Sequence, residues 1–116
     1  MEKSRLNTII IVVVVIVLAL VIINWKNQKP PVEVTDELSK CIGRSSVLYV
    51  QTGCSHCKVQ EDMFGTFLNN LNMINCATDI DKCTKAGIEF TPTWIIKGKT
   101  YTGVQEIKTL KELTGC

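Results

Sequence analysis

The sequence predicts a layered α/β domain with a mixed central sheet flanked by helices, preceded by a single membrane-spanning helix. Every residue from position 9 to position 23 is apolar, and short β-rich runs alternate with helical patterns across residues 35–116. A third feature points to function, because Cys54 and Cys57 lie where the first β-rich run turns into a helix.

Residues 6–25 form the predicted transmembrane helix. A helix of this length rises about 30 Å, the thickness of a bilayer's hydrocarbon core, and Trp25 lies at its end, where an indole ring favours the headgroup layer. A cleaved signal peptide is the alternative, but the apolar run is long for one and no A-x-A-like cleavage site follows. We therefore predict a retained anchor between an N-terminal tail (1–5) and a linker (26–34).

The cysteine content predicts on which side of the membrane the domain lies. Basic residues flank the helix almost equally, so charge alone does not orient it. Six cysteines, all after the linker, are typical of an oxidising compartment. We expect a single-pass cell-membrane protein with its domain (35–116) on the extracytoplasmic side. The net charge of +2, without a basic stripe, argues against nucleic-acid binding.

The first half of the domain is predicted as helix, strand and helix. Thr35 is a candidate N-cap for a helix that Gly43 can end, and residues 46–51 form a β-rich run. The next helix begins at the cysteines and is expected to expose residues 60–62 to solvent. Gly65 marks a bend or the start of a second helix.

The second half is predicted as strand, helix, hairpin and helix. Residues 72–76 form a short candidate strand, and Asp79 or Asp81 can cap a brief helix that Gly87 ends. The remaining elements are two strands joined at Gly98 and a helix with one apolar stripe, at 93–97, 99–102 and 107–113.

The cysteine pair predicts thiol–disulfide exchange. Exchange needs a thiolate that attacks, a second thiol that resolves the mixed disulfide, and access for the partner. Cys54 is the expected nucleophile, since a helix N-terminus lowers a thiol pKa to about 3.5–7.5 from about 8.5. Cys57, one turn further, is the resolving thiol. His56 is expected to tune the pair by stabilising the thiolate; the alternative is a solvated surface residue.

Three other uses of the pair are less well supported. A zinc site would need a second ligand pair at matching spacing, and Cys76 and Cys83 are spaced too widely. A c-type haem needs histidine directly after the second cysteine, where this chain has Lys58. A permanent disulfide between Cys54 and Cys57 would be labile because its loop is short. We expect no metal and no cofactor.

Thr91 and Pro92 give a second signal. A cis X–Pro bond exposes the backbone of the preceding residue, which can pair with an extended substrate segment. The alternative is an ordinary trans proline at the start of a strand. The cysteine pair upstream favours the cis form, so we expect this dipeptide to bind substrate.

A strand, a Cys-x-x-Cys pair on a helix, and then Thr-Pro before a hairpin and a last helix resemble the thioredoxin superfamily. A closer similarity is to the thioredoxin-like domain associated with vitamin K epoxide reductase homologues. It covers about residues 35–115 and rests on the segments 52–57, 63–65, 87–88 and 91–105.

The resemblance implies a thioredoxin-like fold and a membrane partner. In that family the domain is fused to, or anchored beside, a quinone-linked membrane oxidoreductase. Cys54 and Cys57 would pass electrons from exported cysteine-containing proteins to that enzyme. The anchor would hold this chain and the enzyme in one membrane and so raise the effective concentration of each for the other. The buried acid of ordinary thioredoxins would fall at Leu48, which cannot accept a proton, and this departure favours an oxidase.

The four other cysteines are candidates for structural disulfides. The resemblance implies an extra cysteine pair in the region of Cys76 and Cys83, whose bridge would contribute roughly 2.5 kcal/mol. In a thioredoxin-like topology the first and last helices end at the pole opposite the active site. A bridge between Cys41 and Cys116 is therefore geometrically possible; the alternative is two isolated cysteines, one free to link chains.

The sequence thus predicts a membrane-anchored thiol–disulfide oxidoreductase that forms or exchanges disulfides in exported proteins. Its expected oxidant is a quinone-linked membrane oxidoreductase of the vitamin K epoxide reductase type. Two alternatives stay open: an outward-facing disulfide reductase, and a non-enzymatic binding domain that the cysteines only brace. The reduction potential of the Cys54–Cys57 pair distinguishes the binding-domain alternative from an enzyme. A disulfide that only braces a fold usually has a reduction potential below about −300 mV.

Overall fold

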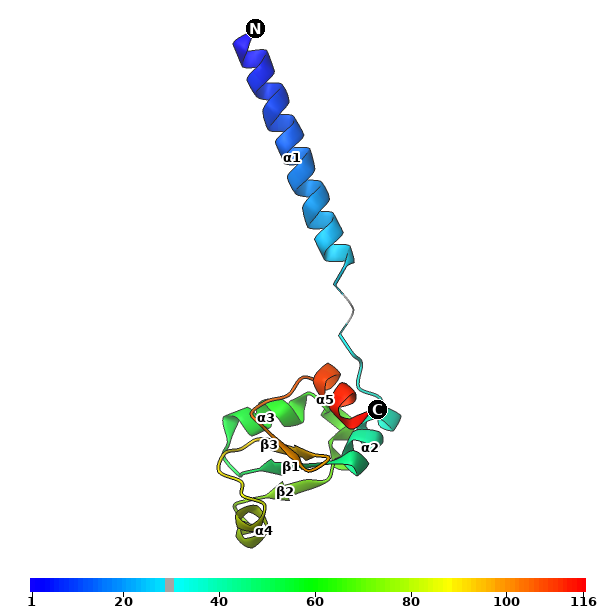
Figure 1. The fold of residues 1–116 in the computed structure, drawn as a ribbon, viewed down its shortest axis with the longest axis vertical. Helices are drawn as coiled ribbons and strands as arrows, with labels where there is room; N and C mark the ends of the chain where they lie inside the picture. Colours follow the sequence, from blue (N-terminus) through cyan, green and yellow to red (C-terminus); the bar gives the residue numbers. More distant parts are fainter. Residues whose placement is uncertain (29–30) are drawn as a thin grey trace. The chain divides into compact units, whose positions relative to one another are not determined.

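The computed structural model describes residues 1–28 and 31–116, which fall into two compact units, Met1–Pro31 and Val32–Cys116 (Figure 1). The predicted linker includes Lys29 and Pro30, which lie outside the described residues.

The first unit contains one helix, α1 (Glu2–Lys26). None of its residues is buried, and its length and apolar composition are sufficient to cross a membrane, a test that an N-terminal signal sequence would also pass. The helix begins before the predicted span of 6–25, since the polar residues at 2–5 are also helical.

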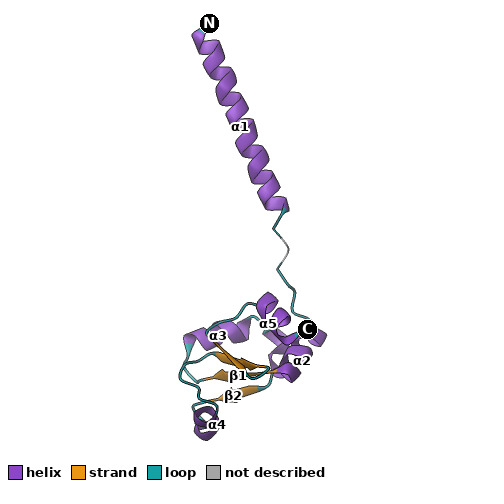
Figure 2. Cartoon of the chain, viewed as in Figure 1, coloured by secondary structure: helices purple, strands orange, loops and turns teal. Residues whose placement is uncertain are grey.

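The second unit is an α/β domain built on a four-stranded mixed sheet (Figure 2). Its strand order is β2-β1-β3-β4; β1 pairs with β2 in parallel and with β3 antiparallel, and β3 pairs antiparallel with β4. This topology confirms the predicted α/β class, with a mixed central sheet. The strands are β1 (Ser46–Val50), β2 (Met73–Asn75), β3 (Thr93–Ile96) and β4 (Lys99–Thr102).

Helices lie before β1, between β1 and β2, between β2 and β3, and after β4, whereas a turn joins β3 to β4. α2 contacts both η1 and α5, and α4 lies beside β2 (Figure 1). α3 ends at Asp62 and η1 begins at Gly65, whose φ of +52° is readily adopted by glycine. The helices are α2 (Asp36–Ser45), α3 (Ser55–Asp62), the 3₁₀ helix η1 (Gly65–Asn70), α4 (Ile80–Lys85) and α5 (Ile107–Thr114).

The core lies where the central strands meet the helices. Trp94 of β3 is opposite Leu48 of β1 in the sheet register, and its ring lies against Phe64, with centroids 6.1 Å apart. Both rings are about 1% exposed, and burial of large aromatic side chains is a main source of stability in a domain this small.

Gly43 does not end α2, contrary to prediction. The helix continues to Ser45, and Gly43 instead lies at a close contact with η1, where a Cβ atom would come 2.0 Å from the carbonyl oxygen of Asn70. The N-terminus of α2 is as predicted, since the Thr35 hydroxyl oxygen accepts a hydrogen bond from the Leu38 N–H at 3.2 Å.

Two disulfides brace the domain in addition to the Cys54–Cys57 pair. One joins Cys41 of α2 to Cys116, with Cα atoms 6.0 Å apart, and so encloses nearly the whole domain in one covalent loop. The other joins Cys76 to Cys83, with Cα atoms 5.7 Å apart. In the chain-entropy model the longer loop contributes about 4.5 kcal/mol, which is large beside a typical domain stability of about 5–15 kcal/mol.

Replacing Gly43 with alanine tests the close contact between α2 and η1. Alanine in a helix is ordinarily more stable than glycine by about 1 kcal/mol. Here the added methyl group must displace backbone, so we expect Gly43→Ala to lower the free energy of unfolding by about 1–3 kcal/mol. Urea unfolding measures the change, with exposed Arg44→Ala as control. An increase in stability would contradict the packing described.

Candidate active site

The turn after β1 places Cys54 at the start of α3. The chain leaves β1 at Val50, and the Cys54 N–H donates to the carbonyl of Gln51 at 3.1 Å. Gly53 completes this turn with a φ of +83°, a conformation that favours glycine. Cys54 therefore occupies the N-cap position of α3, as the sequence predicted for its nucleophile.

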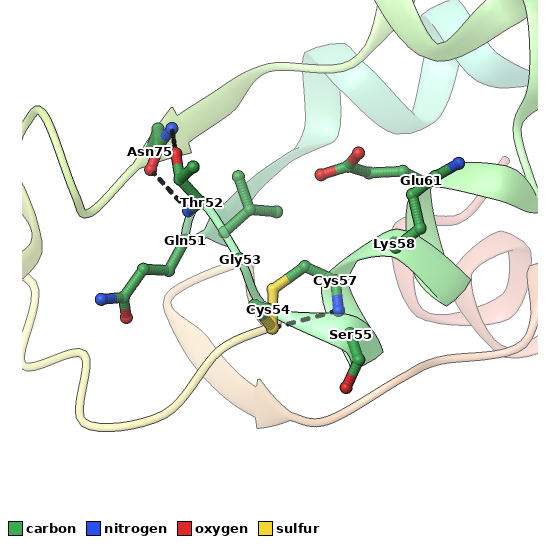
Figure 3. A pocket seen from close by; sticks show the side chains of 10 residues that line it. Gln51, Thr52, Gly53, Cys54, Ser55, Cys57, Lys58, Glu61 and Asn75 are labelled. Carbon is green, nitrogen blue, oxygen red and sulfur yellow. Dashed lines mark hydrogen bonds between the residues drawn. A yellow bond between two sulfur atoms is a disulfide. The ribbon is translucent and has the colours of Figure 1, made fainter.

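The Cys54 sulfur takes the place of a capping oxygen. Its Sγ accepts a hydrogen bond from the backbone N–H of Cys57 at 3.1 Å (Figure 3). That N–H is one of the donors a helix start leaves unpaired, and together with the helix dipole it favours a negative charge on the sulfur. The same contact that caps α3 thus stabilises a Cys54 thiolate.

The two cysteines differ in access. They are joined by a disulfide, with Cα atoms 5.2 Å apart. Cys57 is 2% exposed, whereas Cys54 is only partly buried. An incoming sulfur can therefore reach Cys54 and not Cys57, which matches the order of attack and resolution in thiol–disulfide exchange.

The segment before β3 lies against the Cys54 sulfur. The Thr91–Pro92 peptide bond is cis, and the Thr91 carbonyl oxygen is 3.5 Å from Cys54 Sγ. A disulfide sulfur has no proton to donate, so this contact becomes a hydrogen bond only when Cys54 is a thiol. Pro92 is buried, while Phe90 just before it is 67% exposed.

His56 and Lys58 lie on the exposed surface of α3. Asp62 accepts a hydrogen bond from the Lys58 ammonium, and this bond raises the pKa of Lys58, which stays cationic at neutral pH. Because both partners are solvent-exposed, the pair contributes little to stability. His56 makes no side-chain hydrogen bond within the described residues.

A hollow of about 490 Å³ opens in front of the disulfide (Figure 3). Asn75 fixes one wall, because its Nδ2 donates to the Thr52 hydroxyl at 2.8 Å and its Oδ1 accepts from the Thr52 N–H at 3.3 Å. The Cys76 N–H donates to the Val50 carbonyl at 2.7 Å, so the Cys76–Cys83 loop is tied to the same turn. The lining residues are Val50, Gln51, Thr52, Gly53, Cys54, Ser55, Cys57, Lys58, Glu61 and Asn75.

Gln60 is a site residue that the sequence did not identify. It was expected on the solvent side of α3 but is 0% exposed. Its Oε1 accepts from the Trp94 indole N–H at 3.0 Å and from the Gln105 N–H at 2.7 Å, and its Nε2 donates to the Gln105 carbonyl at 3.0 Å. This network ties the helix of the cysteine pair to the strand that follows Pro92.

The described residues hold no group of three or more histidine, cysteine, aspartate or glutamate side chains that could bind a metal ion. A buried sulfur, an accessible sulfur capped by a helix N–H, and a carbonyl beside it form an arrangement that can accept or release two electrons by thiol–disulfide exchange.

Comparison with known proteins found a relative and a solved structure that resemble part of this chain. No family model matches the chain. The thiol-disulfide oxidoreductase LTO1 of Arabidopsis thaliana is 38% identical over 77 residues, covering 59% of this chain and 20% of that protein. The chain thus spans about a fifth of that relative's length.

A solved structure with partial likeness is the NTD_N/C domain of the alkylhydroperoxide reductase AhpF from Enterococcus faecalis. It superposes with a TM-score of 0.45 and 17% identity, covering 73% of this chain and 45% of that one. The fold class rests on the strand order given above and not on this likeness.

Replacing Gln60 with leucine tests the buried network. Leucine has a similar volume but leaves the Trp94 N–H and both backbone groups of Gln105 without partners, at about 1–3 kcal/mol for each group. We expect Gln60→Leu to lower the free energy of unfolding by about 3 kcal/mol or more. Chemical denaturation of Gln51→Leu, at an exposed glutamine, is the control. Equal stability of the two variants would show that the network contributes nothing.

Proposed function

We propose that this chain is a membrane-anchored thiol–disulfide oxidoreductase that forms or exchanges disulfides in exported proteins. The observation that carries the proposal is the Cys54 sulfur at the start of α3, 3.1 Å from the Cys57 N–H and partly exposed, with its partner sulfur buried behind it. The printed activity of the Arabidopsis relative supports the same reaction.

The geometry supports a two-step exchange. A substrate thiolate attacks Cys54 Sγ, the Cys54–Cys57 bond breaks, and Cys57 leaves with the electron pair and takes up a proton. A second substrate thiolate then attacks the substrate sulfur of the mixed disulfide. The substrate disulfide forms, and Cys54 leaves as a thiolate that the Cys57 N–H stabilises. Two electrons remain on the cysteine pair.

The same stabilisation makes the pair an oxidant. Each pK unit by which a site favours a thiolate is worth about 1.4 kcal/mol, and this preference stabilises the reduced form over the disulfide. The Thr91 carbonyl can accept a hydrogen bond only from the neutral Cys54 thiol, so it stabilises that form and not the thiolate. Stabilisation of the Cys54 thiolate by the Cys57 N–H therefore favours donating the disulfide to a substrate over holding it as a brace.

Returning the pair to the disulfide requires an oxidant, for which we propose a quinone-linked membrane oxidoreductase of the vitamin K epoxide reductase type. Support for this partner comes from the apolar helix α1, which is able to anchor the chain in the same membrane. The six cysteines, all in disulfides, support an oxidising, extracytoplasmic location for the domain.

Cys57→Ala in the full-length, membrane-bound chain tests the proposal. Without the resolving thiol, substrates and the oxidising partner should stay linked to Cys54 as mixed disulfides. Non-reducing gels followed by mass spectrometry identify them. We expect exported cysteine-containing proteins and one quinone-linked membrane enzyme among the adducts.

The double variant Cys54→Ala with Cys57→Ala is the matched control, and it should give no adducts. If the single variant also gives none, the pair only braces the domain. If adducts form with exported proteins but never with a quinone-linked enzyme, exchange stands and the proposed oxidant is wrong.

A further inference from the structure

The resolving cysteine has a proton to exchange, and no buried group close to it can take that proton. Cys57 is 2% exposed, and its thiol must become a thiolate before its sulfur can attack. Leu48 on the adjacent strand is fully buried and apolar. The buried polar residues of the described structure carry neither a carboxylate nor an imidazole: Ser39, Ser46, Gln60, Thr93 and Thr114.

Glu61 is the carboxylate that the fold brings to this sulfur. It follows Cys57 by four residues on α3, so the two side chains lie on the same face of the helix, one turn apart. Both line the hollow in front of the disulfide, and Glu61 is half-buried there. In Figure 3 its carboxylate points into this hollow, toward the turn that carries Cys54.

The other groups around the hollow make Glu61 the carboxylate of this site. Lys58 is the remaining charged residue among those that line it, and its ammonium is bound to Asp62. The opposite wall, residues 50–53 with Asn75, carries no titratable side chain. His56 and Asp62 lie on the same helix but do not line the hollow.

We propose that Glu61 accepts and returns the proton of Cys57 during exchange, an inference that rests on the proposed function. When Cys54 holds a substrate, the Glu61 carboxylate takes the proton from the Cys57 thiol, directly or over one water. The Cys57 thiolate attacks Cys54 Sγ, the bond from Cys54 to the substrate breaks, and the substrate sulfur leaves with the electron pair. In the oxidising direction the same steps run backwards, and Glu61 returns the proton.

A carboxylate at this place has a second effect of opposite sign. Its negative charge disfavours a thiolate on the neighbouring Cys57. If Glu61 acted only as a charge, removing it would speed the attack by Cys57. If Glu61 is the proton acceptor, removing it slows that attack. The effect is strongest at pH values at which the Cys57 thiol does not ionise in the absence of a proton acceptor.

The two attacks can be timed separately with Ellman's reagent in a stopped-flow spectrometer. The full-length chain is used in detergent, with the Cys54–Cys57 pair reduced and the other two disulfides intact. Release of the first thionitrobenzoate reports attack by Cys54, and release of the second reports attack by Cys57 on the mixed disulfide. At neutral pH we expect Glu61→Gln to lower the ratio of the second rate constant to the first by about tenfold or more. The ratio should recover above about pH 9, where a thiol ionises in water.

Glu112→Gln is the matched control, because it makes the same exchange at an exposed glutamate of α5 that does not line the hollow. It is expected to change the ratio less than twofold. A ratio that stays constant or rises in Glu61→Gln, or falls equally in both variants, would overturn the assignment of Glu61. A wild-type chain that releases no second thionitrobenzoate would refute the proposed function itself, and that result needs no substitution to be seen.

Discussion

The hydrogen bond from the Cys57 N–H to the Cys54 sulfur is the interaction on which the proposed activity of this domain depends. A helix start leaves backbone donors without partners, and here a sulfur accepts one of them at 3.1 Å. Because the acceptor is a sulfur, the cap that begins α3 also favours the anionic form of the reactive group. One local contact therefore links the folding of the helix to the chemistry of the pair.

The rest of the domain holds that helix start against the segment before β3, which the sequence predicts to bind substrate. Cys54 and Thr91 are 37 residues apart in sequence, yet the Thr91 carbonyl lies 3.5 Å from the Cys54 sulfur. The antiparallel pairing of β1 with β3 brings the two segments together, and Gln60 fixes α3 to Trp94 behind them. The covalent loop from Cys41 to Cys116 limits how far the surrounding helices can separate.

Features with a local cause could be predicted from the sequence. The Thr35 cap, the start of a second helix at Gly65 and the cysteine pair at a helix start each depend on a few neighbouring residues, and the structure contains all three. The alternation of helices and strands was enough to predict the α/β class, because each element has its own hydrophobic period.

Features that depend on distant partners could not be read in this way. Gln60 looked like a solvent residue because its partners, Trp94 and Gln105, are 34 and 45 positions away. Gly43 looked like a helix end because glycine often stops helices, whereas its role is to admit the backbone of Asn70. In both cases the tertiary contact, and not local preference, explains the residue.

The most direct test of the central claim is the reactivity of the reduced Cys54 thiol with iodoacetamide across the pH range. Alkylation requires the thiolate, so the pH of half-maximal rate reports how strongly the helix start stabilises that charge. The account predicts a midpoint at least one unit below that of free cysteine, which is about 8.5. A midpoint at or above that of free cysteine, or no alkylation at any pH, would contradict it.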